Sequence, residues 1–205
     1  MSGPLRVLTV DPSMTNTGFC LPDGTTTALG TKPDADATGM ADHIHRLHRE
    51  QLLRERMTDL ADTHGIDLVV IEGYAPNQHT NAIYSGELGA LLRDRADSSD
   101  YAWVVVPPNL RGKYATGKGN ASKDLVLQEV SARTGRVFAS SDECDAWVLW
   151  AMAQDAYQLP NAWGMPQSHR DALTGVDWPT VGARRALWAP HCTYKPPKKK
   201  VKKRG

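Results

Sequence analysis

Near its start the chain reads VLTVD over residues 7–11, and further along it reads LVVIE over residues 68–72. Both segments are short apolar runs that end in a carboxylate, the pattern of a buried strand whose last residue enters a loop. A carboxylate at such a position is costly to bury unless something compensates its charge. Asp11 and Glu72 therefore predict a charged site at the ends of two strands.

A second pair of carboxylates, Asp142 and Asp145, lies three residues apart at the start of the apolar stretch 146–150. Residues three apart share one face of a helix, so this pair can join the two strand-end carboxylates around a hard divalent cation. Mg²⁺ is the first candidate, and Mn²⁺ could substitute for it. Glu143 would point roughly 100° away and is the less expected ligand. Ordinary negative charge at a helix N-terminus is the alternative for the pair alone.

Turn residues and apolar periodicity divide the rest of the chain into strands and helices. Short turns join the first three strands, which favours an antiparallel meander, and strands alternate with helices afterwards. This order predicts an α/β fold with a mixed central sheet flanked by helices. Strands are expected at about 5–11, 17–22, 25–31, 67–73 and 101–106, and helices at about 38–63, 81–95, 122–133 and 141–158.

Residues 1–158 are predicted to form the main domain of this 205-residue chain. An extension over 159–190, helical near 165–176, and a basic disordered tail over 191–205 are expected to follow. The last eleven residues hold seven Lys/Arg and no acidic residue, which leaves 17 basic and 23 acidic groups in the remainder. An acidic body with a basic arm is typical of a protein that meets a polyanion. A tail that only aids solubility is the alternative.

The sequence predicts neither a membrane protein nor a secreted one. No apolar run approaches the roughly 20 residues of a membrane span, and the N-terminus lacks the apolar segment of a signal peptide. The three cysteines, Cys20, Cys144 and Cys192, have no C-x-x-C spacing and cannot all pair. A reduced, cytoplasmic chain is therefore expected.

Three motifs resemble the RuvC family, the Holliday-junction resolvases of the ribonuclease H-like superfamily. They occur in the family's order, over roughly residues 5–158, and read DPSMTNTG at 11–18, IE at 71–72 and DECDA at 142–146. The resemblance implies a ribonuclease H-like fold and a crossover junction endodeoxyribonuclease that serves DNA recombination and repair.

The same resemblance implies a catalytic, Mg²⁺-binding role for Asp11, Glu72, Asp142 and Asp145. It also implies branched DNA as the partner and a homodimer that nicks the paired strands of a four-way junction symmetrically. The long extension and the lysine-rich tail are unlike a compact bacterial resolvase. They suggest a phage-encoded relative that acts in the host cytoplasm.

The segment 109–123 is expected to be a Gly-rich basic loop that contacts DNA. Glycines let the backbone approach phosphates, and basic side chains supply the counter-charge. Its candidate DNA-binding residues are Arg111, Lys113, Lys118 and Lys123. The family resemblance favours Lys113 and Lys123 among them. A mobile solvated loop is the alternative.

Tyr74 is a further DNA-binding candidate, because the family has an aromatic side chain just after its second carboxylate. In this chain Gly73 intervenes, so the aromatic stands in a slightly shifted place. A buried core tyrosine is the alternative for this position.

Other functions stay open on the sequence alone. The same metal site would serve a flap, replication-fork or RNA–DNA hybrid nuclease. A non-catalytic nucleic-acid-binding module is disfavoured by the four intact carboxylates. An actin-like or Hsp70-like ATPase, which the first motif also resembles, needs two related domains, and 205 residues leave no room for both.

Overall fold

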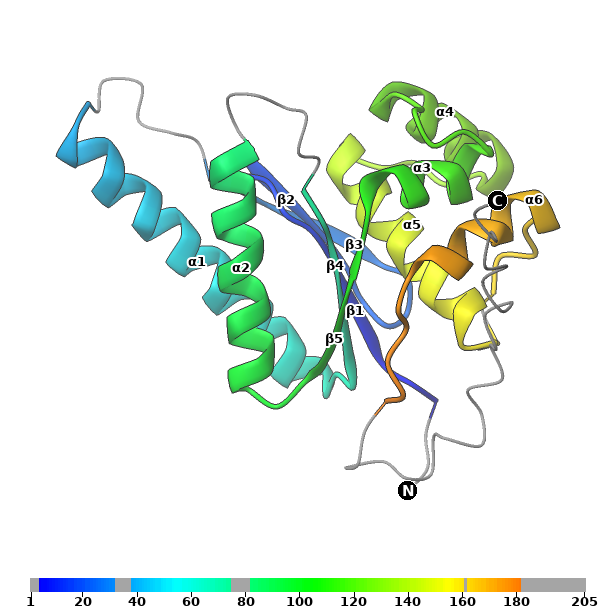
Figure 1. Ribbon diagram of the computed structural model, residues 1–205, viewed down its shortest axis with the longest axis horizontal. Helices are drawn as coiled ribbons and strands as arrows, with labels where there is room; N and C mark the ends of the chain where they lie inside the picture. The colour runs from blue at the N-terminus through cyan, green and yellow to red at the C-terminus, as the bar shows by residue number, and fades with distance from the viewer. Residues whose placement is uncertain (1–3, 32–37, 75–81, 161, 182–205) are drawn as a thin grey trace, which may run out of the picture.

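The computed structural model describes residues 4–31, 38–74, 82–160 and 162–181. Five strands form one sheet in the order β3-β2-β1-β4-β5 (Figure 1). β1 pairs antiparallel with β2, as β2 does with β3, whereas β4 runs parallel to β1 and to β5. The mixed sheet predicted from the sequence is therefore confirmed. Its strands are β1 Val7–Asp11, β2 Asn16–Cys20, β3 Thr26–Gly30, β4 Leu68–Glu72 and β5 Ala102–Val106.

Helices cover both faces of the sheet, as Figure 1 shows. α1 (Met40–His64) and α2 (Ala82–Ser98) lie on one face. The other face carries α5 (Ser141–Ala156), with α3 (Pro108–Thr116) and α4 (Lys123–Thr134) packed beside it. This double cover explains why the strands read as continuous apolar runs rather than as alternating ones.

Alternate residues of each strand enter different cores, because successive side chains point to opposite faces of a sheet. Val7 belongs to the core around α5, whereas Leu8 belongs to the core under α1 and α2. Leu68 and Val69 divide between the same two cores. The odd positions of β1 and the even positions of β4 thus face α5, and both strands end in a carboxylate on that face.

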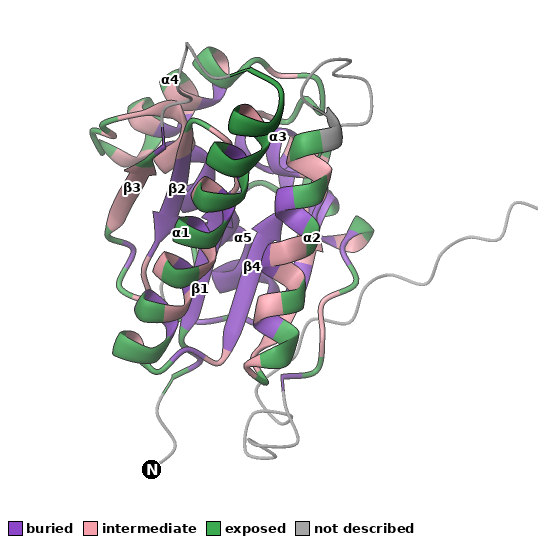
Figure 2. Ribbon diagram, turned by 90° about the vertical axis from the view of Figure 1, so that its left-hand side faces the viewer, coloured by how far each residue is buried: buried purple, intermediate pink, exposed green. Residues whose placement is uncertain are grey.

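The inner surface of α1 differs from the one that apolar periodicity predicts. Met40, Ile44 and Leu47 are exposed on its N-terminal half, which is largely solvent-facing in Figure 2. Arg46 and Glu50 are buried instead. Apolar spacing identified the buried side only in the C-terminal half, where Met57 and Leu60 are buried. In the N-terminal half, ionic groups between α1 and α2, including an Arg46–Glu87 pair, occupy that side.

The Gly-rich segment predicted as one loop over 109–123 contains most of helix α3 (Pro108–Thr116). Pro107 precedes the helix and Pro108 occupies its first turn, where the missing N–H of proline costs nothing. Gly117 ends the helix with φ of 78°, a left-handed conformation that glycine adopts without strain. The basic residues of this segment are therefore held on a rigid element.

Residues beyond α5 pack against the same core as the first part of the chain. In place of the single helix expected at 165–176, the structure has the short helix α6 (Gln167–Arg170) and a 3₁₀ helix, η1 (Asp171–Gly175). His169 Nδ1 lies 2.8 Å from the Tyr114 carbonyl oxygen of α3. The basic tail and the end of the extension lie outside the described residues. Within the described part, no helix combines the length and apolarity needed to cross a membrane.

Candidate metal and nucleic-acid site

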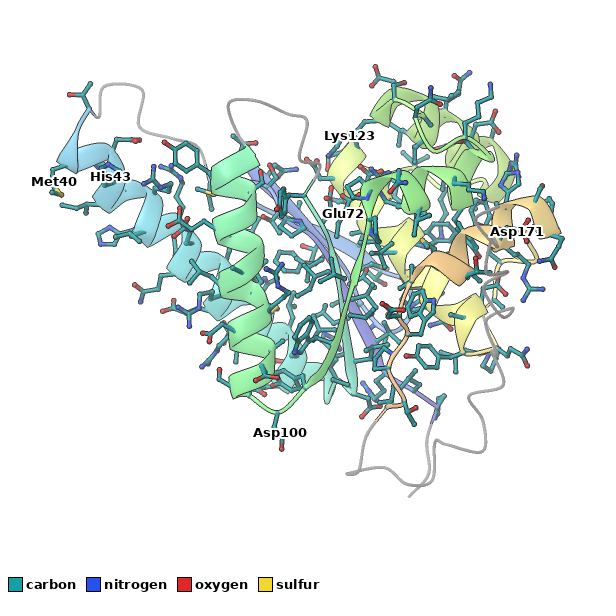
Figure 3. All side chains as sticks on the ribbon, in the orientation of Figure 1. Met40, His43, Glu72, Asp100, Lys123 and Asp171 are labelled. Carbon is teal, nitrogen blue, oxygen red and sulfur yellow. The ribbon has the colours of Figure 1, made fainter. Side chains whose placement is uncertain are left out.

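Three of the predicted carboxylates meet at one edge of the sheet. Asp11 ends β1 and Glu72 ends β4, and these strands are parallel neighbours, so their ends coincide. Asp145 enters the same space from the first turns of α5. One oxygen of each residue lies within 4.8 Å of the other two, and all three residues are buried. Figure 3 shows Glu72 at this edge, close to Lys123.

Three local features hold the start of α5 in place, one within the helix and two in its contact with the sheet. The Ser140 hydroxyl accepts a hydrogen bond from the Glu143 amide and caps the helix. The Thr9 hydroxyl of β1 donates to the Ala146 carbonyl at 2.6 Å. Gly18 of β2 leaves room for the helix end, since a Cβ there would stand 2.1 Å from the Asp142 carbonyl oxygen. Only glycine allows this close approach.

Asp142 lies at the rim of the cluster rather than inside it. One of its oxygens accepts from Lys123 Nζ at 2.7 Å, and the other accepts from Asn16 Nδ2 at 2.9 Å. Glu143 turns away and accepts from the Thr26 hydroxyl of β3 at 2.8 Å. The expectation that Glu143 is the less suitable ligand agrees with this geometry. Asn16 was missed from the sequence, although it belongs to the first motif.

Two basic side chains penetrate the cluster. Arg111 Nε donates to Glu72 Oε1 at 2.6 Å, and Arg111 Nη1 pairs with Asp145 Oδ1. Lys123 Nζ lies 3.3 Å from Asp11 Oδ2 and 3.4 Å from Asp145 Oδ2. The Arg111 side chain is only 7% exposed, whereas that of Lys123 is 49% exposed.

The structure corrects the expected placement of Arg111 in a surface loop, while its contact with DNA stays a prediction. Sequence reasoning grouped it with nearby basic residues and could not tell which of them faces inward. The structure places it on α3, with its guanidinium against two buried carboxylates. This position makes Arg111 part of the carboxylate site.

Burial gives the carboxylates unusual acid–base properties. Desolvation, followed by the repulsion of Glu72, raises the pKa of Asp11 well above its usual range. Desolvation also raises the pKa of Asp145 to about 7, although Arg111 opposes the shift. Burial would lower the pKa of Lys123, but Asp11 and Asp145 outweigh it and raise that pKa, so the ammonium stays charged.

One buried carboxylate oxygen of the cluster has no hydrogen-bond donor. Asp145 Oδ2 is buried and makes no hydrogen bond, even though Lys123 Nζ stands 3.4 Å away. Hard oxygen donors held this closely suit a divalent cation such as Mg²⁺. The residues present therefore fit a metal, which Asp11, Glu72 and Asp145 would hold, with Asp142 at the rim.

The remaining predicted DNA contacts lie around this site. Lys113 is half-buried on α3, and Lys118 is exposed between α3 and α4. The Tyr74 ring is 51% exposed and lies beside Gly86 of α2. It is thus not the buried core tyrosine that the sequence left open. A DNA-contacting role for these three residues stays a prediction.

Comparison with known proteins gives consistent results. No protein-family model matches the chain. The crossover junction endodeoxyribonuclease RuvC of Nocardia farcinica is 28% identical over 148 residues, which cover 71% of this chain and 78% of the relative. The structure of Thermus thermophilus RuvC aligns with a TM-score of 0.53 at 16% identity, over 71% of this chain and 90% of that one. The structure of T. thermophilus RuvC in complex with a Holliday junction substrate aligns with a TM-score of 0.52 at 15% identity, over 71% of this chain and 89% of that one. The fold is ribonuclease H-like.

Proposed function

We propose that this RuvC-like chain is a metal-dependent, structure-selective DNA endonuclease that resolves Holliday junctions. The observation that carries the proposal is the buried group of Asp11, Glu72 and Asp145, whose oxygens lie within 4.8 Å of one another. Carboxylates so arranged on a ribonuclease H-like sheet support phosphodiester hydrolysis. The 28% identity to a crossover junction endodeoxyribonuclease supports the substrate.

Mg²⁺ is the proposed cofactor, and Mn²⁺ the expected substitute. When bound, such an ion supplies an activated water and neutralises charge on the scissile phosphate. Asp11, Glu72 and Asp145 would hold it, and Asn16 would keep Asp142 oriented through its 2.9 Å hydrogen bond.

Basic side chains around the cluster are proposed to position the DNA backbone. Lys123 keeps its proton because its pKa is raised by Asp11 and Asp145, and its half-exposed side chain can turn toward a phosphate. Lys113 and Lys118 extend the basic surface along α3 and the turn that follows it. The exposed Tyr74 ring offers a surface on which an unpaired base can stack.

A homodimer is proposed as the working form, because resolution of a four-way junction needs two strands to be cut. One chain contributes one carboxylate cluster among its described residues. Two copies related by a two-fold axis would place matching sites on the paired strands of the junction.

The decisive experiment compares two variants from the same helix turn. Asp145→Asn removes a charge inside the cluster and should reduce Mg²⁺-dependent cleavage of a synthetic four-way junction to background while junction binding persists. Glu143→Gln is the matched control, since Glu143 faces Thr26 rather than the cluster, and it should cleave normally. Cleavage retained by Asp145→Asn would contradict the catalytic assignment.

A substrate panel then tests which nucleic acid is cut. The purified chain should cleave the four-way junction faster than a flap, a replication fork, an RNA–DNA hybrid or a linear duplex of matched sequence. Preference for one of the other substrates would keep the chemistry and replace the Holliday junction as substrate.

A further inference from the structure

The guanidinium of Arg111 occupies the interior of the carboxylate cluster. Its Nε donates to Glu72 Oε1 at 2.6 Å, and its Nη1 pairs with Asp145 Oδ1. Both oxygens belong to residues that would hold a metal ion, so the guanidinium and a cation compete for the same ligands. An arginine cannot give up its charge to relieve this competition, because its guanidinium stays protonated in proteins.

The charges of the cluster indicate how many divalent cations it can accept. The four carboxylates of Asp11, Glu72, Asp142 and Asp145 carry four negative charges when ionised, and Arg111 and Lys123 cancel two of them. The two charges that remain match one divalent cation. A second divalent cation would bring the cluster to a net positive charge in a buried place, which is unfavourable.

The two basic residues differ in how easily they can leave. Lys123 is 49% exposed and sits at the start of α4, so its flexible side chain can swing into solvent. Arg111 is 7% exposed and lies on α3, where Tyr114 and Ala115 of the same helix are fully buried. Its guanidinium, buried and paired with both Glu72 and Asp145, is less free to leave than the Lys123 ammonium. Arg111 is therefore the group that limits metal loading.

We propose that Arg111 acts as a resident cation that takes the place of a second metal ion. The free chain then binds a single divalent cation, and a second one enters only when the guanidinium leaves Glu72 and Asp145. This inference rests on the metal site of the proposed function and is independent of the DNA substrate. The buried Asp145 Oδ2, which makes no hydrogen bond, is the acceptor left for the first ion.

The test counts Mn²⁺ ions bound to the chain in the absence of DNA, by calorimetry and by electron paramagnetic resonance. The unmodified chain should bind one ion. Arg111→Gln removes the charge at similar length and should bind a second ion, or bind the first at least about tenfold more tightly. Arg111→Lys keeps the charge and should resemble the unmodified chain more than Arg111→Gln does. Arg133→Gln, which alters an exposed pair with Glu129, is the control and should change nothing.

Two outcomes overturn the proposal: two ions of similar affinity on the unmodified chain, or Arg111→Gln indistinguishable from it. No ion on any variant would instead contradict the metal site of the proposed function. Failure to cut a four-way junction would leave this result untouched, because no DNA is used.

A second measurement avoids a variant that fails to fold. The Arg111 Nε–H of the unmodified chain is hydrogen-bonded in a buried site, so its ¹H–¹⁵N signal can be followed by NMR and assigned by its loss in Arg111→Lys. The first Mg²⁺ equivalent should leave the Arg111–Glu72 hydrogen bond in place, and only excess Mg²⁺ should shift the signal substantially. Release of the guanidinium by the first equivalent would overturn the proposal.

Discussion

Gly18→Ala should damage the site, because Gly18 of β2 lies directly against the first turn of α5 at Asp142. An added Cβ would stand 2.1 Å from the Asp142 carbonyl oxygen and 2.5 Å from its carbonyl carbon. Real Cβ atoms do not approach closer than 3.0 Å, so the start of α5 must move by about 0.9 Å. Both neighbours are backbone atoms, which cannot rotate away as a side chain would.

The expected cost follows from that displacement. Overpacking of this kind destabilises by about 1–3 kcal/mol, which lowers Tm by about 2–12 °C for a chain of this size. The same movement displaces Asp142 and Asp145, and a misplacement of about 1 Å can slow a reaction by about a hundredfold. Cleavage of a four-way junction, measured well below the Tm of the variant, separates the lost activity from the lost stability.

Gly30→Ala is the matched control, since Gly30 also lies in a strand. The nearest atom to its added Cβ would be Asn16 Oδ1 at 3.8 Å, an ordinary contact. This variant should keep both activity and stability. The reasoning is refuted if Gly18→Ala unfolds and cleaves like Gly30→Ala.

Three further predictions concern charge. The pKa of Asp145 is raised from an ordinary 3.8 to about 7. Between these two pH values the folded chain without metal keeps a proton that the unfolded chain has lost. The free energy of unfolding should therefore fall as pH rises from about 4 to about 7. Urea unfolding in chelator should show this fall. Asp145→Asn should reduce it and leave the part that comes from Asp11, whose pKa is also raised, and stability that rises instead would contradict the shift. Deleting residues 195–205 should weaken junction binding and make it less dependent on salt. If all seven basic residues contact phosphate, the slope of log binding constant against log salt concentration should become shallower by about six at most. An unchanged slope would show that the tail does not contact phosphate. Arg170→Ala should lower the free energy of unfolding by about 1.5–3 kcal/mol, measured by thermal unfolding, because it removes two charged contacts from the largely buried Asp155. Arg133→Ala, in an exposed pair, should lower it by less than about 0.5 kcal/mol. Equal losses would refute a structural role for the C-terminal segment.

The strand-end carboxylates were predictable from the sequence because one local rule governs them. An apolar run that ends in an acid places that acid at a strand end, and the period of two puts Asp11 on the α5 side with Val7 and Thr9. Parallel pairing of β1 with β4 then brings Glu72 alongside. The first step needs no knowledge of distant contacts, whereas the second depends on the pairing of strands that lie about 60 residues apart in the chain.

The partners of those carboxylates were not predictable in the same way. Arg111 and Lys113 are both basic and two residues apart, and only the packing of α3 against α5 decides that Arg111 faces Glu72 and Asp145. Three glycines in the segment also suggested a loop, although Pro108 at the first turn was a helix signal. The buried ionic side of α1 was missed for a related reason, since packing against α2, where Arg46 pairs with Glu87, decides which charges are buried.

The order of the carboxylates along the chain has a consequence during protein synthesis. Asp11 and Glu72 leave the ribosome early, but the Thr9–Ala146 hydrogen bond that seats α5 joins residues 137 positions apart. Contacts of such separation form late, after most of the chain has emerged. A nascent chain that ends before α5 therefore holds the two strand-end carboxylates without Asp145. Fragments that end before α5 lack Asp142 and Asp145 and should therefore be unable to cut DNA, so unfinished copies should be harmless to a cell.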